Sequence, residues 1–223
     1  GRVIAQVKRV VQTGSLNPKE VTVPGVFIDD IVVCENPLEE HRQTSSWYFD
    51  PSYCGQARVP QENIPAASFN ERKFIARRGA MELYHGAVVN LGTGIPNDMV
   101  GRVCNEEGIS DDIMITVESG IYGGVQAGGI DFGIGQNLYA MIGHHEQMDY
   151  YNGAGVDITY MGIGELGEDG SVNSTKMGVR CTGAGGFIDI TQNAKKVVFL
   201  GTFTAGGAKY KFENRKLEIL QEG

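Results

Sequence analysis

The feature that most constrains the fold of this chain is the alternation of short apolar runs with helical patterns in its central part. Residues 87–91 and 113–117 are short, largely apolar and rich in β-branched side chains, as buried strands are. A helical pattern with an N-cap at Ser68 or Asn70 runs to Gly86, before the first run, and another, 97–107, separates the two. This order predicts an α/β fold, a mostly parallel sheet with crossover helices.

The flanking regions are interpreted by the same criteria. Residues 35–68 carry four prolines and no sustained period, which indicates a long ordered connection of the kind that joins domains or has a function. The other expected elements are strands at 3–11, 21–34, 157–163 and 195–203, a short helix at 187–194, a hairpin around the turn 167–170 and a terminal hairpin around Asn214.

Composition excludes several classes of function. The chain has 27 acidic against 19 basic residues, which disfavours nucleic acid and anionic membranes as main partners. No apolar run is long enough to span a bilayer. The four cysteines have irregular spacing that supports neither a disulfide framework nor a zinc site, so we expect a cytoplasmic protein with reduced thiols and no metal.

Glu118 is the strongest candidate for a chemical role. It follows the apolar run 113–117 directly and opens a stretch, 119–129, that is dense in glycine. A carboxylate at the end of a buried strand is presented to the crevice above the sheet, and glycines let the backbone approach a ligand closely. We therefore expect a carboxylate that reacts or coordinates.

Other glycine turns have weaker signals. The turn 92–96 lies between a strand and a helix, where an anion or thioester can bind, although a purely structural turn remains an alternative. The cluster 183–186 offers consecutive backbone donors near a helix start, suited to an oxyanion. The run 162–167 matches a dinucleotide fingerprint only formally, because no helix follows it. A structural role is favoured for all four histidines, His41, His85, His144 and His145.

Three motifs together resemble the family I CoA-transferases. They are VVNLGTGIP at 88–96, VESGIYGG at 117–124 and GAGGFIDITQNAKKVVFLGTFTAGG at 183–207. The greatest similarity is to the short-chain acyl type, typified by propionate (acetate) CoA-transferase. The resemblance implies that residues 67–223 form the second, glutamate-bearing domain, truncated at its C-terminus. Residues 1–66 are then the C-terminal part of a related first domain with the interdomain connection.

The resemblance also implies a reaction. Such enzymes transfer CoA from a short-chain acyl-CoA to a free acid, such as acetate or propionate, by a ping-pong mechanism. Their nucleophilic glutamate matches Glu118, which would carry a covalent glutamyl-CoA thioester. Coenzyme A is then substrate and covalent intermediate, and no tightly bound cofactor is expected. No general base is needed, because the carboxylate is expected to be ionised at neutral pH, but water must be excluded.

The remaining site assignments follow from the same motifs. Gly185 and Gly186 are the oxyanion candidates. The expected CoA- and acyl-binding residues are Gly92, Gly94, Ile95 and Pro96 at the thioester and Gly123, Gly124, Gly128 and Gly129 along the pantetheine arm.

The chain is also expected to have protein partners. Because most of the first domain is absent, we expect this chain to be a segment that works with the rest of the same enzyme. The assembly is expected to be a homo-oligomer, with tetramers common in similar proteins. Two other functions remain open: an acyl-CoA hydrolase on the same scaffold, and a sugar-phosphate-binding sensor or isomerase.

Overall fold

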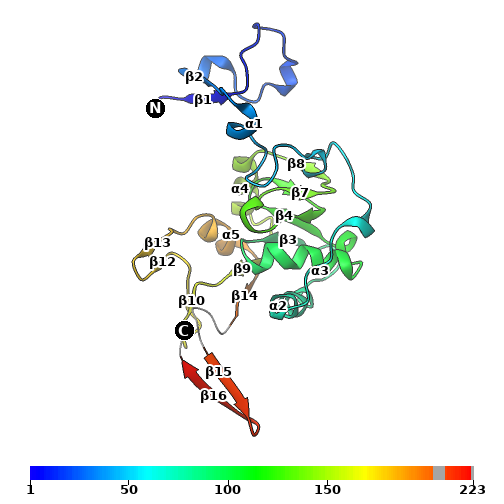
Figure 1. Cartoon of the computed structure of the whole chain (residues 1–223), viewed down its shortest axis with the longest axis vertical. Coiled ribbons are helices and arrows are strands. Elements are labelled where there is room, and N and C mark those ends of the chain that lie inside the picture. Colours follow the sequence, from blue (N-terminus) through cyan, green and yellow to red (C-terminus); the bar gives the residue numbers. More distant parts are fainter. Residues whose placement is uncertain (203–208, 222–223) are drawn as a thin grey trace. The chain divides into compact units, whose positions relative to one another are not determined.

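The computed structural model describes residues 1–202 and 209–221 and divides into two compact units, Gly1–Asp50 and Pro51–Gly223. Figure 1 shows the chain coloured along its sequence. The units are described one at a time below. The last five residues of the third motif, 203–207, lie outside the described residues. They include Phe203, the expected last residue of the strand 195–203.

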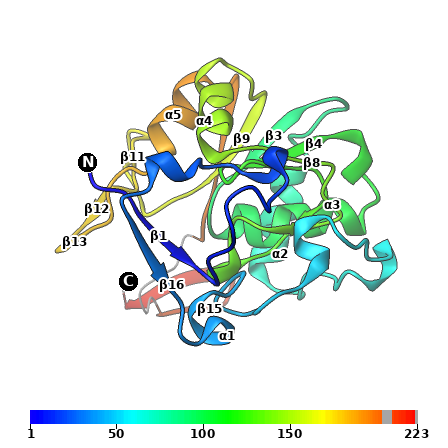
Figure 2. The ribbon, with the colours of Figure 1, turned by 90° about the horizontal axis from the view of Figure 1, so that it is seen from above.

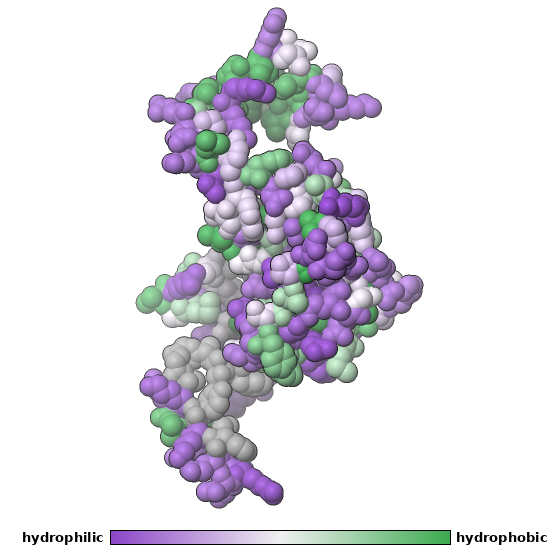
Figure 3. Space-filling view, turned by 45° about the vertical axis from the view of Figure 1, so that its right-hand side comes forward, coloured by the Kyte–Doolittle hydropathy of each residue, from purple (hydrophilic) through white to green (hydrophobic). Residues whose placement is uncertain are grey.

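The first unit is built on a parallel strand pair. Strand β1 (Ile4–Val7) pairs with β2 (Asp30–Val33), and α1 (Pro37–Glu40) follows. Both strands are shorter than the sequence suggested. Strand β1 ends at Val7, and within the predicted strand 21–34 a 3₁₀ turn at Gly25–Phe27, preceded by Pro24, which cannot donate to a ladder, delays the start of β2 to Asp30. Apolar side chains face solvent throughout this unit, and only Cys34 is buried in it (Figure 3).

The second unit contains a six-stranded sheet within the described residues. Its order is β14 (Lys196–Leu200), β9 (Ile158–Gly162), β3 (Val88–Leu91), β4 (Met114–Val117), β5 (Ile121–Tyr122) and β8 (Ala140–Met141). The first four strands run parallel, and β5 and β8 join antiparallel. The expected α/β fold with a mostly parallel sheet is confirmed.

Helices cover both faces of this sheet (Figure 2). On one face lie α2 (Glu71–Ala80) and α3 (Gly101–Glu106), which a π-helical turn at Pro96–Val100 precedes. On the other face lie α4 (His144–Asn152) and α5 (Phe187–Asn193).

Three of these helices correspond to sequence predictions. Helix α2 begins after Asn70, whose side chain accepts from the Lys73 N–H, and it ends at Ala80, earlier than the predicted 86. The predicted helix 97–107 is present as the π-helical turn followed by α3, and α5 matches the predicted 187–194.

Helix α4 was missed by the sequence interpretation. It buries only Gln147 and Tyr151, too short an apolar stripe to give a helical period. The Glu146 carboxylate accepts from the Gly143 N–H and so caps its start.

Short strand pairs complete the second unit. The hairpin at 167–170 is confirmed, but it is closed by β10 (Glu165–Leu166) and β11 (Val172–Asn173), because 158–162 lies in the central sheet instead. The terminal hairpin is confirmed as β15 (Lys209–Glu213) and β16 (Lys216–Gln221). The other pairs are β6 (Val125–Gln126) with β7 (Gly135–Gln136) and β12 (Lys176–Met177) with β13 (Arg180–Cys181). In the described ranges, no helix has the length and apolar character that crossing a membrane requires.

Candidate active site

A cavity of about 1000 Å³ opens at the carboxyl ends of the parallel strands. Its lining includes the residue that directly follows each of the four parallel strands. These residues are Gly92 after β3, Glu118 after β4, Ile163 after β9 and Gly201 after β14. This is the position at which open α/β sheets bind ligands.

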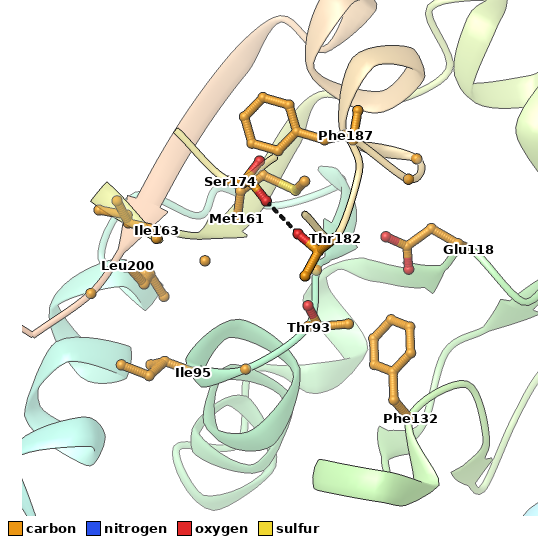
Figure 4. Close-up of a pocket in the computed structure, with 18 of the residues that line it drawn as sticks. Thr93, Ile95, Glu118, Phe132, Met161, Ile163, Ser174, Thr182, Phe187 and Leu200 are labelled. Carbon is orange, nitrogen blue, oxygen red and sulfur yellow. Dashed lines mark hydrogen bonds between the residues drawn. The ribbon is translucent and has the colours of Figure 1, made fainter. Parts of the chain in front are cut away.

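Glu118 directs its carboxylate into this cavity, above Phe132 and beside Thr182 (Figure 4). The residue is half-buried, and its Oε2 atom is fully buried without a hydrogen-bond partner among the described residues. Burial is the main cause that raises the pKa of Glu118 to about 7, and its own backbone N–H and the side chain of Asn90 partly oppose this shift. The sequence-based expectation of a simply ionised carboxylate at neutral pH therefore needs correction, because burial brings the protonated form into the same pH range.

A row of polar side chains crosses the sheet next to Glu118. Thr159 on β9, Asn90 on β3 and Thr116 on β4 are register partners, and all three are fully buried. Thr116 and Glu118 lie two residues apart, so they share one face of β4 and its extension. Tyr151 of α4 covers the row.

The sequence interpretation did not single out this row. The signal was present, because each residue is a polar side chain inside an otherwise apolar strand. Without the sheet order, however, nothing showed that the three positions are neighbours.

The turn after β3 matches the expected site in part. Gly92, Gly94 and Ile95 line the cavity. A Cβ at Gly92 would lie 2.9 Å from the Tyr160 carbonyl oxygen, and Gly94 has a φ of +87°, so both positions favour glycine. Pro96 is buried and begins the π-helical turn, and it is not among the described residues that line the cavity.

The two oxyanion candidates lie in the same cavity, immediately before α5. A Cβ on Gly186 would stand 3.8 Å from Glu118 Cγ, which places this backbone next to the carboxylate. A Cβ on Gly185 would meet no described atom within 4 Å, so Gly185 borders open space. The structure thus brings together Glu118, the turn 92–95 and the pair 185–186.

The other four glycines are not part of the described lining of this cavity. A Cβ at Gly123 would lie 2.3 Å from the Tyr139 ring, and one at Gly124 would lie 2.0 Å from the Gln136 carbonyl oxygen. Gly128 packs against Asp98, and the Gly129 N–H donates to the Asp98 carboxylate at 2.9 Å. Close packing of the protein against itself accounts for glycine at 123, 124 and 128, and their contact with pantetheine stays a prediction.

The remaining lining combines apolar side chains, the hydroxyl side chains of Thr93, Ser174, Thr182 and Thr202, and a few ionisable groups. His144, for which sequence favoured a structural role, is exposed and lines the cavity with Asp189, Glu71 and Arg72. In the described part of the chain, no three His, Cys, Asp or Glu side chains come together in a way that could hold a metal ion. The apolar side chains are Ile95, Phe132, Met148, Met161, Ile163, Met177, Phe187 and Leu200.

Comparison with known proteins finds relatives along the whole chain. No family model matches. A caffeate CoA-transferase of Acetobacterium woodii is 40% identical over 228 aligned residues, covering 100% of this chain and 43% of that protein. The acetate CoA-transferase YdiF of Escherichia coli K12 is 37% identical over 223 residues, covering 100% of this chain and 41% of that protein.

A solved structure shows the same similarity. A crystal structure of YdiF from E. coli O157:H7, as a thioester complex with CoA, matches with a TM-score of 0.73 and 37% identity over 100% of this chain and 40% of that one. The chain therefore spans about two fifths of the length of these relatives. Along its entire length, this chain is a homologue of the CoA-transferases.

Proposed function

We propose that the protein carrying this chain transfers CoA from an acyl-CoA to a free carboxylic acid, with Glu118 as the nucleophile. The observation that carries the proposal is the half-buried Glu118 carboxylate, with a buried unpartnered oxygen, in a cavity at the carboxyl ends of the parallel strands. The homology to CoA-transferases supports the reaction class.

The proposed reaction is balanced without a net proton transfer. The Glu118 carboxylate attacks the thioester carbonyl, which forms a mixed anhydride and releases CoA thiolate. The thiolate then attacks the glutamyl carbonyl, which leaves a glutamyl-CoA thioester and the donor's carboxylate. The acceptor acid reverses both steps and departs as the new acyl-CoA.

This chemistry requires a site with little water and backbone donors to the oxyanion, and the described residues suit both requirements. Apolar side chains line much of the cavity, which disfavours water that would hydrolyse the anhydride or thioester. Gly185 and Gly186 immediately precede α5, and Gly186 lies beside Glu118, so their backbone N–H groups are the candidate donors to the oxyanion. We assign the stabilisation of the tetrahedral oxyanion to this segment.

We propose a short-chain acid, such as acetate or propionate, as the natural acceptor. The acetate CoA-transferase among the relatives supports this choice. An aromatic acid is the second candidate, favoured by the caffeate CoA-transferase relative and by Phe132 and Phe187 in the lining. Assays with acetate and with a phenylpropenoic acid as alternative acceptors distinguish the two through kcat/KM.

The first unit supports a proposal about partners. Parallel sheets normally have both faces covered, yet Ile31, Val32 and Val33 of β2 are exposed. We propose that residues 1–66 are the C-terminal part of a first domain, completed by further polypeptide of the same enzyme, together with the interdomain connection. Residues 67–223 then contribute the glutamate-bearing domain. The working assembly is proposed to be a cytoplasmic homo-oligomer.

Peptide mapping after incubation with acetyl-CoA or propionyl-CoA, without acceptor, tests the function directly. The expected result is a peptide that carries CoA at Glu118, and no adduct in Glu118→Ala. The exposed Glu82→Gln serves as a control variant that still forms the adduct. Absence of an adduct from the wild type, with transfer intact, would falsify the nucleophile assignment.

Kinetic comparison separates the alternative functions. For a transferase, acetate accelerates CoA exchange, whereas a hydrolase releases CoA at the same rate without acetate. A sugar-phosphate sensor would bind its ligand equally well after Glu118→Ala, because removing a negative charge does not weaken phosphate binding.

A further inference from the structure

Resting on the proposed function, we propose that Asn90 is a positioning residue, whose side-chain amide holds the Glu118 carboxylate in its reactive, ionised form. Thr159 and Tyr151 orient this amide. In the buried row formed by Thr159, Asn90 and Thr116, each hydroxyl group has only one hydrogen atom to donate.

The threonines determine the direction of the hydrogen bonds. The Thr116 hydroxyl donates to the Val89 carbonyl oxygen at 2.9 Å, so its single hydrogen is used. Tyr151, whose hydroxyl lies 2.8 Å from the Thr116 oxygen, must therefore donate to Thr116. On the far side of the row, the Thr159 hydroxyl donates to Asn90 Oδ1 at 2.8 Å.

One donor of Asn90 is left over. Its Nδ2 atom donates one hydrogen to the Tyr151 oxygen at 3.0 Å. An amide nitrogen carries two hydrogens, and the second is not used by any of these bonds. Because Thr159 holds Oδ1 on the opposite side, the amide cannot flip without losing two bonds.

Glu118 offers the matching acceptor. It continues the face of β4 that carries Thr116, and its buried Oε2 lacks a partner among the described residues. The Asn90 side chain opposes the upward shift of the Glu118 pKa, as a donor to the charged form does. Gly186 of the proposed oxyanion segment also lies beside this carboxyl group, since a Cβ there would stand 3.8 Å from Glu118 Cγ.

Other ionisable groups also face this region. Tyr151 and His144 approach from α4, Tyr122 from β5 and Asp189 from α5, while Glu71 and Arg72 border the cavity at α2. His144 is the group to separate experimentally from Glu118, and His144→Gln does so. The pH midpoint is expected to persist in that variant.

The test is the pH dependence of covalent CoA attachment to Glu118, measured by quenched single-turnover reactions and mass spectrometry in the whole protein that carries this chain. The wild-type rate is expected to rise with a midpoint near pH 7. In Asn90→Ala the midpoint moves upward by about one pH unit, since a hydrogen bond to a charged group is lost.

A second pair of variants keeps the inference falsifiable if Asn90→Ala does not fold. Thr159→Val preserves shape but removes the donor that orients Asn90, so the midpoint moves upward, and Thr159→Ser restores it. Asn97→Ala, at a buried asparagine outside the row, is the matched control for stability: it lowers Tm without moving the midpoint.

The outcomes are distinguishable. If the wild type never forms the adduct at Glu118, the proposed function fails. If the wild type forms it, and Asn90→Ala and Thr159→Val keep the wild-type midpoint, the function stands and the role of Asn90 is overturned.

Discussion

The two faces of the central sheet differ in chemistry although the same strands build both. Toward α2 and α3, β3 presents Val89 and Leu91 to an apolar cluster that includes Val103 and Cys104. Toward α4, the same strand presents Asn90 within a hydrogen-bonded row. Alternation along a strand therefore lets one face provide stability while the other holds a reactive carboxylate.

Burial raises the pKa of an ionisable group on each face, with different consequences for its charge. On the apolar face, burial raises the pKa of the Cys104 thiol to about 12, so the thiol stays neutral. On the polar face, burial raises the pKa of Glu118 to about 7, which puts the neutral and charged forms in balance near physiological pH. If the faces are independent in this way, substitutions on one face should leave the properties of the other unchanged.

On the apolar face, Leu91→Ala is expected to lower the free energy of unfolding by about 3 kcal/mol, because Leu91 is fully buried and truncation leaves a cavity. Urea unfolding measures the change. The pH midpoint of CoA attachment should stay at the wild-type value. A shifted midpoint would show that the two faces are not independent.

On the polar face, Glu118→Gln is expected to make stability less dependent on pH. The pKa of Glu118 in the folded protein, about 7, is above its ordinary value of 4.5. The contribution of the protonated form is thus fully present below pH 4.5 and is lost as pH rises through 7. Relative to Glu118→Gln, the wild type should lose about 3 kcal/mol between pH 4.5 and pH 8.5. Unfolding curves of both proteins across this range provide the measurement, and a constant difference would contradict the expectation.

Gln147→Leu should raise the free energy of unfolding by about 1 kcal/mol, because neither amide atom of the fully buried Gln147 forms a well-aligned hydrogen bond among the described residues, although the Tyr122 and Tyr151 hydroxyls lie near it. Gln126→Leu is the matched control. Gln126 is equally buried, but its Nε2 donates to the Gly123 carbonyl oxygen, so its replacement is expected to destabilise. Equal effects of the two substitutions in thermal unfolding would argue against this reasoning.

Glu82→Gln, outside both faces, is expected to have the smallest effect. Hydrogen bonds from Lys196 and Arg78 lower the pKa of this exposed carboxyl group to about 2. Its stabilising contribution is present above about pH 4.5 and is lost as pH falls through 2. The small decrease in Tm caused by Glu82→Gln at pH 7 should therefore shrink at pH 3. High salt should reduce it as well.

Much of the second unit follows from local pattern. The β-branched runs, the capping Asn70 and the glycine turns predicted β3, α2 and the parallel order correctly. Helix α4 could not be found in this way, since its few buried residues give no helical period. In the first unit, apolar runs were interpreted as long strands because composition does not show how prolines interrupt pairing.

The position of Glu118 at the end of a buried strand, beside glycines, can be predicted from sequence alone, because strand composition and turn chemistry are local properties. The residues that surround Glu118 become known only from the folded arrangement. Asn90, Thr116 and Thr159 are far apart in the chain and become neighbours through sheet register, and Tyr151 reaches them from a helix on one face. The raised pKa of Glu118 has the same origin, since it depends on the burial that this packing creates.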